Sequence, residues 1–391
     1  MISPLQRDEL YCEPMNIAYQ MVERESDFLA VVKKLKDEKI IGVDLEADSF
    51  YHYQAKVCLI QLSSRKEIYL IDPLHLSGMG SLAPVFANPG ICKVFHGADY
   101  DIRSLHRDFG IEVSALFDTQ IASRFLGSSE TGLAHLIQER FGVHLDKKFQ
   151  KKDWSKRPLP SAMREYAARD VYYLIPLAKA LQTQLKEADR LAWVREECEV
   201  LSRVRDRGND LEKPLFLKVR GAAHLGSRSL SVLESILQYR DRMARKRDLP
   251  PFKILGNATI LEMGEKTPLT RQDLSGISGL SERQIKHLGD PLLNRIRRVM
   301  ALPREALLTY PKTTRVRTRQ ETAKKMKVLK KWRRETARDM GIDEALILNK
   351  AQMQALAHPP SDVKQPPAMV QVLKKWQHRA FAGDIQCLLD G

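Results

Sequence analysis

A short apolar run in the first fifty residues ends in two acids and limits what this chain can fold into. The run Ile40–Val43 is mostly β-branched and follows a polar, charged stretch, which predicts a central β-strand. Strand side chains alternate between the two faces of a sheet, so Asp44 and Glu46 share one face. The sequence therefore predicts a sheet that carries paired carboxylates on one face of a central strand.

Three further residues are predicted to converge on the same place. A second apolar run, Ile91–Phe95, comes shortly before Asp101, and Gly97 between them permits a tight turn. This places a third carboxylate near the end of a neighbouring strand. Tyr166 and Asp170 lie among strong helix formers, and their i, i+4 spacing puts both on one helical face. Four acids and one tyrosine are thus expected at one site.

Carboxylates in this arrangement suit metal-assisted cleavage of a phosphodiester. Hard divalent ions such as Mg²⁺ or Mn²⁺ prefer carboxylate oxygens, and two of them about 4 Å apart clamp the attacking and leaving oxygens of an in-line displacement. In this interpretation Asp44 bridges both ions, and Glu46, Asp101 and Asp170 complete their coordination. Tyr166 orients the water, because a phenol with a pKa near 10 is too weak an acid to serve as a full base.

Each of these motifs has a purely structural explanation when it is taken alone. An Asp-x-Glu pair is common by chance, Asp101 fits the first turn of a helix because of the helix dipole, and a Tyr-x-x-x-Asp pair often combines a packing aromatic with a surface acid. Their order on strand, turn and helix is the context that favours a catalytic site.

The segment from Ile41 to Leu174 resembles the catalytic domain of ribonuclease D and its relatives. Four blocks carry the resemblance, in the order found in that family: VDLEADSFYHYQAKVCLIQLSS, KVFHGADYDIRSLHRDFG, FDTQIASRFLG and FGVHLDKKFQKKDWSKRPLP. The resemblance implies an α/β ribonuclease H-like (DnaQ-like exonuclease) fold with a mixed sheet flanked by helices. It also implies a 3′-to-5′ exonuclease in which four acids hold two metal ions.

Two positions bear on the branch of the family. Glu165 stands five residues before Asp170, where the histidine branch has its histidine, so Tyr166 favours the tyrosine (DEDDy-type) branch. Leu45 separates the first two acids, where bacterial ribonuclease D usually has threonine. In that respect the block resembles the nuclear exonuclease subunit of the eukaryotic exosome.

A basic loop interleaved with aromatics lies between the third and fourth acids. Basic and aromatic side chains together suit single-stranded nucleic acid, whose phosphates and bases need both. Lys147 is the expected substrate contact, by its position in the resembling block. Trp154 is a substrate-contact candidate that more simply packs the loop onto the fold. Gln61 and His96 lie beside the predicted site, and either contacts substrate or only satisfies local hydrogen bonds.

The remaining elements of this part are predicted from their periodicity. Helices are expected from Ser26, Asp99, Asp118 and Thr131 and over residues 161–175, with an interruption at Pro176. Further strands are expected at 57–62 and 68–71.

The positive charge of the chain lies almost entirely downstream. Residues 1–200 carry 26 Lys and Arg against 29 acids, whereas residues 201–391 carry 38 against 20, within a total charge of +15. Such charge attracts phosphates without regard to sequence, although a basic surface that only aids solubility remains an alternative. The predicted domains are an exonuclease at 1–205, a connector at 206–228, a helical domain at 229–305, and a basic linker with a second helical region at 306–391.

The helical domain resembles the HRDC module of ribonuclease D and certain helicases, which binds nucleic acid or docks. Its helix from Leu230 to Arg245 has an apolar stripe opposite arginines, followed by LPPF, by LTRQDLSGISGL and by a closing helix through Ile296. A second, diverged copy is indicated because WRRETARDMGI resembles YRDRMARKRDL. The fold class is therefore an α/β catalytic domain followed by all-α HRDC-type modules.

The five cysteines are scattered and odd in number, which favours a reducing compartment and argues against zinc. No apolar stretch approaches the roughly 18 residues that span a membrane, and Asp8, Glu9 and Glu13 do not fit a signal peptide. We expect a cytoplasmic monomer.

By resemblance, the predicted enzyme releases nucleoside 5′-monophosphates from the 3′ ends of transfer-RNA precursors and other structured RNAs, with two Mg²⁺ or Mn²⁺ ions. A DNA 3′ exonuclease is the alternative, because proofreading and Werner-type domains resemble this fold and only contacts to the 2′-hydroxyl separate the two. A catalytically inactive nucleic-acid-binding scaffold is the remaining alternative, although all five site positions hold competent residues.

Overall fold

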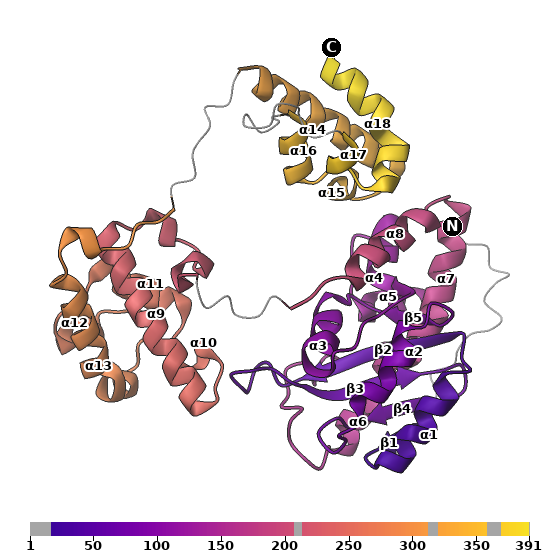
Figure 1. Cartoon of the computed structure of the whole chain (residues 1–391), viewed down its shortest axis with the longest axis horizontal. Helices are drawn as coiled ribbons and strands as arrows, with labels where there is room; N and C mark the ends of the chain where they lie inside the picture. The colour runs from indigo at the N-terminus through magenta and orange to yellow at the C-terminus, as the bar shows by residue number, and fades with distance from the viewer. Residues whose placement is uncertain (1–16, 207–212, 312–319, 358–368, 391) are drawn as a thin grey trace. The chain divides into compact units, whose positions relative to one another are not determined.

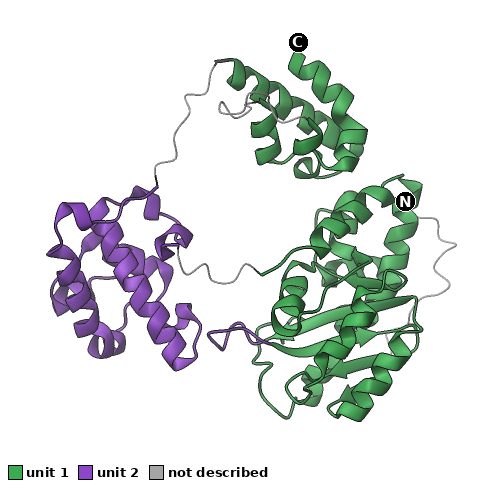
Figure 2. Cartoon of the chain, viewed as in Figure 1, with its two compact units in different colours: residues 1–47, 57–206, 315–391 green, residues 48–56, 207–314 purple. Residues whose placement is uncertain are grey.

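The computed structural model describes residues 17–206, 213–311, 320–357 and 369–390 (Figure 1). The chain forms two compact units (Figure 2): unit 1 comprises residues 1–47, 57–206 and 315–391, and unit 2 comprises residues 48–56 and 207–314. The domain boundaries expected from the sequence, at residues 205, 228 and 305, stay a prediction. Three predicted features lie at least partly outside the described residues: the acids that do not fit a signal peptide, the connector and the basic linker.

A six-stranded mixed sheet forms the centre of the first part of unit 1, as predicted. Its spatial order is β1-β4-β3-β2-β5-β6, in which β3 is antiparallel to β2 and β4 while the other pairs are parallel. The strands are β1 Gln20–Val22, β2 Ile40–Ala47, β3 Val57–Ser63, β4 Ile68–Ile71, β5 Cys92–Phe95 and β6 Leu116–Asp118. The two outer strands, β1 and β6, were missed because three residues carry too little periodicity to be recognised.

In the chain, helices lie between the strands of this sheet and continue after the last strand (Figure 1). They are α1 Glu25–Leu35, α2 Ala83–Ala87, α3 Asp99–Phe109, α4 Thr119–Phe125, α5 Leu133–Phe141, α6 Ser161–Tyr172, α7 Leu174–Glu187 and α8 Leu191–Ser202. The interruption predicted at Pro176 occurs instead at Tyr173, between α6 and α7. Pro176 lies in the first turn of α7, where a helix needs no N–H from that residue.

A close contact between strand and helix sets the geometry of the predicted site. A Cβ atom on Gly42 in β2 would lie 2.4 Å from Ser63 Oγ, 3.2 Å from Leu174 Cβ and 3.3 Å from the Val171 carbonyl. Ser63 Oγ also donates a 3.0 Å hydrogen bond to the Val171 carbonyl. Only glycine lets the end of α6 approach β2 this closely. The acids two and four residues beyond Gly42 therefore face α6.

Two helical modules share one internal pattern. The first module, in unit 2, is α9 Ser227–Arg247, α10 Pro251–Ile254, α11 Asn257–Lys266, α12 Arg271–Ser275 and α13 Glu282–Met300. The second module, in unit 1, is α14 Gln320–Met340, α15 Glu344–Ile347, α16 Lys350–Ala357, α17 Met369–Val372 and α18 Lys375–Asp390.

The shared pattern is a matched pair of hydrogen bonds. In the first module Arg240 donates to the Leu255 carbonyl at 3.0 Å, and in the second Arg333 donates to the Leu348 carbonyl at 3.1 Å. The Gln284 amide donates to the Ile254 carbonyl, and the Gln377 amide donates to the Ile347 carbonyl. The separation in sequence is the same for every pair of equivalent residues. These contacts support the predicted second copy of the module.

Aromatic and ionic contacts attach the second module to α8 within unit 1. Trp376 stacks on Trp193 with ring centroids 4.8 Å apart, and its indole N–H donates to Glu197 at 2.8 Å. The Lys374 ammonium also binds Glu197, at 2.5 Å. Within the described residues, none of the helices has the length and apolar character that crossing a bilayer requires.

Candidate active site

The structure brings together three of the four predicted acids. Asp44 and Glu46 lie on β2, and Asp170 lies on α6, the helix that approaches β2 at Gly42. Carboxylate oxygens of these three residues all lie within 4.8 Å of one another. The acids that share one face of β2 and the acid on α6 therefore converge at one point, as expected from strand alternation and helical spacing.

Asp101 lies at the side of this group. It is in the first turn of α3, only 8% exposed, and is outside the three-carboxylate cluster. Its charge nevertheless acts on the cluster: burial and the charge of Asp44 raise the pKa of Asp101 well above its usual range, and Asp101 in turn raises the pKa of Glu46. The fourth acid therefore belongs electrostatically to the site.

Burial and mutual repulsion raise the pKa values of the acids in the cluster. Burial raises the pKa of Asp44 to about 7. Burial, followed by the charges of Asp44, Asp170 and Asp101, raises the pKa of Glu46, and burial with the charge of Asp44 raises that of Asp170. No lysine or arginine forms an ion pair with these four acids within the described ranges. Four carboxylates sharing a buried space without a counter-ion suit a hard divalent cation.

Tyr166 is held beside the cluster as a neutral phenol. It is 8% exposed, and its hydroxyl hydrogen-bonds Asp170 one turn along α6. Burial, with the charges of Asp170 and Glu46, raises the pKa of Tyr166 far above its usual range. Its ring lies edge-on to Phe149, at 5.6 Å between centroids, and at 6.2 Å from Trp154. These contacts fix the ring and favour a positioning role over that of a base.

A pocket with a volume of about 330 Å³ opens over the cluster. Of the four predicted substrate contacts, Lys147 and His96 line it together with Asp44, Glu46, Tyr166 and Asp170. His96 Nδ1 lies 2.9 Å from Thr119 Oγ1, and burial lowers the pKa of His96, so its imidazole is neutral at pH 7. Lys147 thus supplies a cation to the wall of the pocket.

Gln61 and Trp154 do not reach the pocket. Both are fully buried at 0% exposure and neither lines the pocket, so the structure does not support them as substrate contacts. Gln61 lies on β3 directly opposite Asp44, and its amide makes no hydrogen bond to any described group. Trp154 packs against Tyr166, which agrees with the packing explanation given for it above.

Several residues that line the pocket were not predicted from the sequence. Gln150 and Asp146 belong to the basic loop and could have been suspected from their closeness to Lys147. The wall formed by Gly132, Leu133 and Ala134 carries no signal in the sequence. These residues reach the pocket only because the start of α5 lies over the acids, which is decided by tertiary packing.

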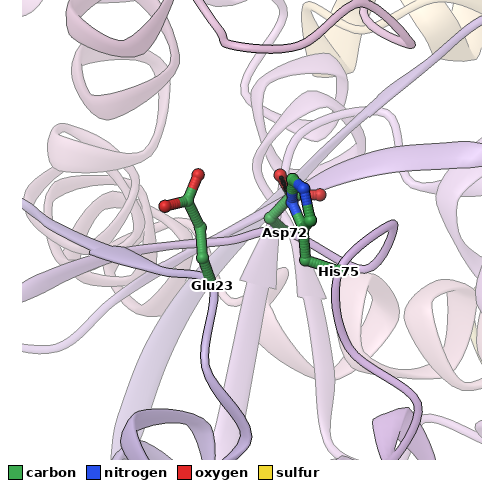
Figure 3. Close-up of side chains that lie close together, drawn as sticks. All are labelled: Glu23, Asp72 and His75. Carbon is green, nitrogen blue, oxygen red and sulfur yellow. Dashed lines mark hydrogen bonds and ion pairs between the residues drawn. The ribbon is translucent and has the colours of Figure 1, made fainter.

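Glu23, Asp72 and His75 form a second group of potential metal ligands, drawn in Figure 3. The Asp72 carboxylate already accepts hydrogen bonds from the Arg157 guanidinium, from His75 Nδ1 at 2.9 Å and from the Leu74 N–H at 3.0 Å. Arg157 and His75 lower the pKa of Asp72. We therefore interpret this group as an ion-pair anchor.

The anchor holds the basic loop to the sheet. Arg157 belongs by sequence to this loop, but its guanidinium is enclosed and donates to the carbonyls of Cys58 at 2.6 Å and Trp154 at 2.7 Å. It is a structural residue that attaches the Trp154 segment to β3 and to Asp72.

Comparisons with known proteins agree with this geometry. Residues 19–186 match a family model described as 3′-5′ exonuclease, and residues 229–296 match the HRDC domain. The structure is similar to Escherichia coli RNase D, an exoribonuclease involved in structured RNA processing, with a TM-score of 0.71 and 25% identity over 96% of this chain and 99% of that one.

Sequence relatives include proteins of the eukaryotic exosome. The chain is 34% identical over 269 residues to the exosome complex component 10 homolog of Caenorhabditis elegans, covering 66% of this chain and 30% of the relative. It is 32% identical over 297 residues to RRP6-like 1 of Arabidopsis thaliana, covering 72% and 46%. The chain therefore spans less than half the length of these curated relatives.

For this group of exosome proteins, a crystal structure of a catalytic core is matched over most of its own length. The catalytic core of RRP6 from Trypanosoma brucei is 31% identical, with a TM-score of 0.63, over 76% of this chain and 86% of that core. The predicted ribonuclease H-like fold followed by HRDC-type helices is thereby confirmed. The chain belongs to the ribonuclease D-like family, in which a 3′-5′ exonuclease domain is followed by an HRDC domain.

Proposed function

We propose that this chain is a divalent-metal-dependent 3′-to-5′ exoribonuclease that releases nucleoside 5′-monophosphates from structured RNAs, transfer-RNA precursors among them. The observation that carries the proposal is the convergence of Asp44, Glu46 and Asp170 within 4.8 Å, with Asp101 coupled to them, at a pocket that also presents Lys147. The match to a ribonuclease along nearly its whole length supports RNA as the substrate.

The residues present fit two Mg²⁺ or Mn²⁺ ions, which Asp44, Glu46, Asp101 and Asp170 would hold through their carboxylate oxygens. Bound divalent ions lower the pKa of water and neutralise charge on a leaving oxygen. The structure supports this donor set through four acids that have raised pKa values and only oxygen ligands to offer.

The other residues of the pocket have separate tasks. Tyr166 remains protonated and hydrogen-bonded to Asp170, so its hydroxyl holds a water in line with the scissile phosphate. The Lys147 ammonium binds a phosphate oxygen of the terminal nucleotides. The neutral His96 is available to hydrogen-bond the substrate at the pocket wall.

A substrate comparison tests the proposal. A 3′-extended transfer RNA and a DNA strand of matched sequence are each incubated with Mg²⁺, with Mn²⁺ or with chelator, using the full chain and its Asp101→Asn variant. We expect a ladder that shortens from the 3′ end of the RNA, only with metal and only with the unaltered chain. Preferred cleavage of the DNA, internal cuts, or full activity in the variant would overturn the proposal.

We also propose that the chain works as a cytoplasmic monomer. Light scattering combined with gel filtration tests the monomer, and fluorescence microscopy of the tagged full chain in its own cells tests the location.

A further inference from the structure

One face of α14 gathers exposed cations; the helix itself is labelled in Figure 1. The opposite face is buried: Leu329 is 0% and Ala337 is 4% exposed, and the helix packs against α15, α16 and α18. At about 100° per residue, five exposed cations lie within about 40° of the direction opposite Leu329. We call them the cation stripe: Lys324, Lys327, Lys331, Arg334 and Arg338.

The stripe is poorly neutralised by its own helix. No acid lies within it, and the described contacts to flanking acids are Lys331–Glu335 at 3.9 Å and Arg338–Asp339 at 3.3 Å, with both cations more than three-quarters exposed. Exposed pairs of this kind contribute little. Like charges three and four residues apart destabilise a helix, so the stripe is not explained by the stability of α14.

The equivalent face of the first module is used differently. There the corresponding positions on α9 include two acids, Glu234 and Asp241. The Glu234 carboxylate accepts hydrogen bonds from the backbone N–H groups of Leu215 and Phe216, at 3.1 and 2.9 Å. Asp241 accepts a 2.8 Å hydrogen bond from the Tyr53 hydroxyl, also in unit 2. The first module thus covers this face with Leu215, Phe216 and Tyr53, whereas the second module presents cations on the equivalent face.

We propose that the cation stripe binds the phosphate backbone of a double-helical part of the RNA substrate. The stripe runs over about 21 Å of helix axis, a length over which a duplex with the charge spacing of B-DNA carries about twelve charges. Recognition of single strands adds aromatic stacking to cations, but the sole aromatic of α14, Trp332, packs against Phe381 on the buried side. The identity of the ligand rests on the proposed function.

Salt-dependent binding tests this inference. The full-length Lys327→Gln, Lys331→Gln, Arg334→Gln triple variant is compared with the unaltered chain. A matched control replaces three exposed lysines in the last turn of α1 and in the residues that follow it, which form no ion pair in the part of the chain that is described: Lys33→Gln, Lys36→Gln and Lys39→Gln. The probe is a fluorescent RNA hairpin of about twelve base pairs, twice the length that the stripe spans, with a short single-stranded 3′ tail. Anisotropy is measured with chelator over a range of salt concentrations.

We expect the slope of log affinity against log salt to fall by about 2.7 in the stripe variant, and the affinity at 0.15 M salt to fall on the order of 100-fold. The control should bind as the unaltered chain does, and circular dichroism should show both variants folded. Unchanged hairpin binding by the folded stripe variant would overturn the inference and would point to an acidic protein as the partner.

A cleavage assay separates this inference from the proposed function. With metal, an unstructured RNA as short as the hairpin's tail should be cleaved equally by the unaltered chain and the stripe variant, because the acids of the site are intact. An equal loss on the short RNA and on the hairpin would overturn the stripe as a duplex contact. Failure of the unaltered chain to cleave either RNA would overturn the proposed function, while the hairpin binding result would still decide the stripe.

Discussion

The raised pKa of Asp44 predicts that a residue proposed to bind the metal ions destabilises the metal-free fold. Its folded pKa is about 7, against an ordinary value of 3.8. Because the folded pKa is raised, protonation stabilises the fold: this contribution is complete below the unfolded pKa and is lost as the pH rises through about 7. The shift of about three units corresponds to about 4 kcal/mol.

The perturbation is Asp44→Asn, which keeps the shape of the side chain and removes its titration. With chelator present, we expect the variant to be more stable than the unaltered protein by up to about 4 kcal/mol at pH 8, and by about 3 kcal/mol less at pH 5. Taking the difference between the two proteins cancels the titration of groups that do not interact with Asp44. The loss of its charge also lowers the pKa values of Glu46, Asp101 and Asp170, which favours the variant at pH 8 in the same direction. Urea denaturation at each pH, followed by circular dichroism, measures the effect.

Metal should reverse the order of stability. Added Mg²⁺ occupies the carboxylates and stabilises the unaltered protein at pH 8, while the variant responds weakly and does not cleave RNA. A variant that is no more stable than the unaltered chain at pH 8 with chelator, or a difference independent of pH, would refute the explanation of the site as a crowded group of unneutralised acids.

Two further variants test the site, and a third, with its control, tests the Asp72 anchor. Tyr166→Phe should lower kcat about 10- to 100-fold with little change in KM, because it removes only the positioning of water; an unchanged kcat would exclude this role. Lys147→Ala should raise KM about tenfold through loss of a phosphate contact, and a change confined to kcat would contradict it. Asp72→Asn should destabilise the fold by about 3–5 kcal/mol because it leaves the enclosed Arg157 without its partner, whereas Asp290→Asn, in the exposed pair with Arg271, should cost less than about 1 kcal/mol. Equal losses in urea denaturation would contradict the anchor.

The sequence by itself determined the local elements and the chemistry. The periodicity of Phe28, Val31, Val32 and Leu35 predicted α1, and all four are buried. Short apolar runs located β2 to β5 to within a few residues. The acid pair on β2 and the Tyr166–Asp170 pair on α6 were predictable because strand alternation and helical spacing are local properties.

Only the tertiary structure decided what surrounds these acids. No local pattern distinguishes the buried Gln61 and Trp154 from the pocket residue Lys147, because all three are polar or aromatic residues near the site. The same holds for Arg157, which belongs by sequence to a basic loop and by structure to the Asp72 anchor. Burial of a side chain depends on which segment packs over it. Arg157, for example, is enclosed by Cys58 and Asp72, which lie far from it along the chain. The sequence therefore identified the groups that we propose for the chemistry, whereas long-range packing decided which side chains reach the pocket and which hold the fold.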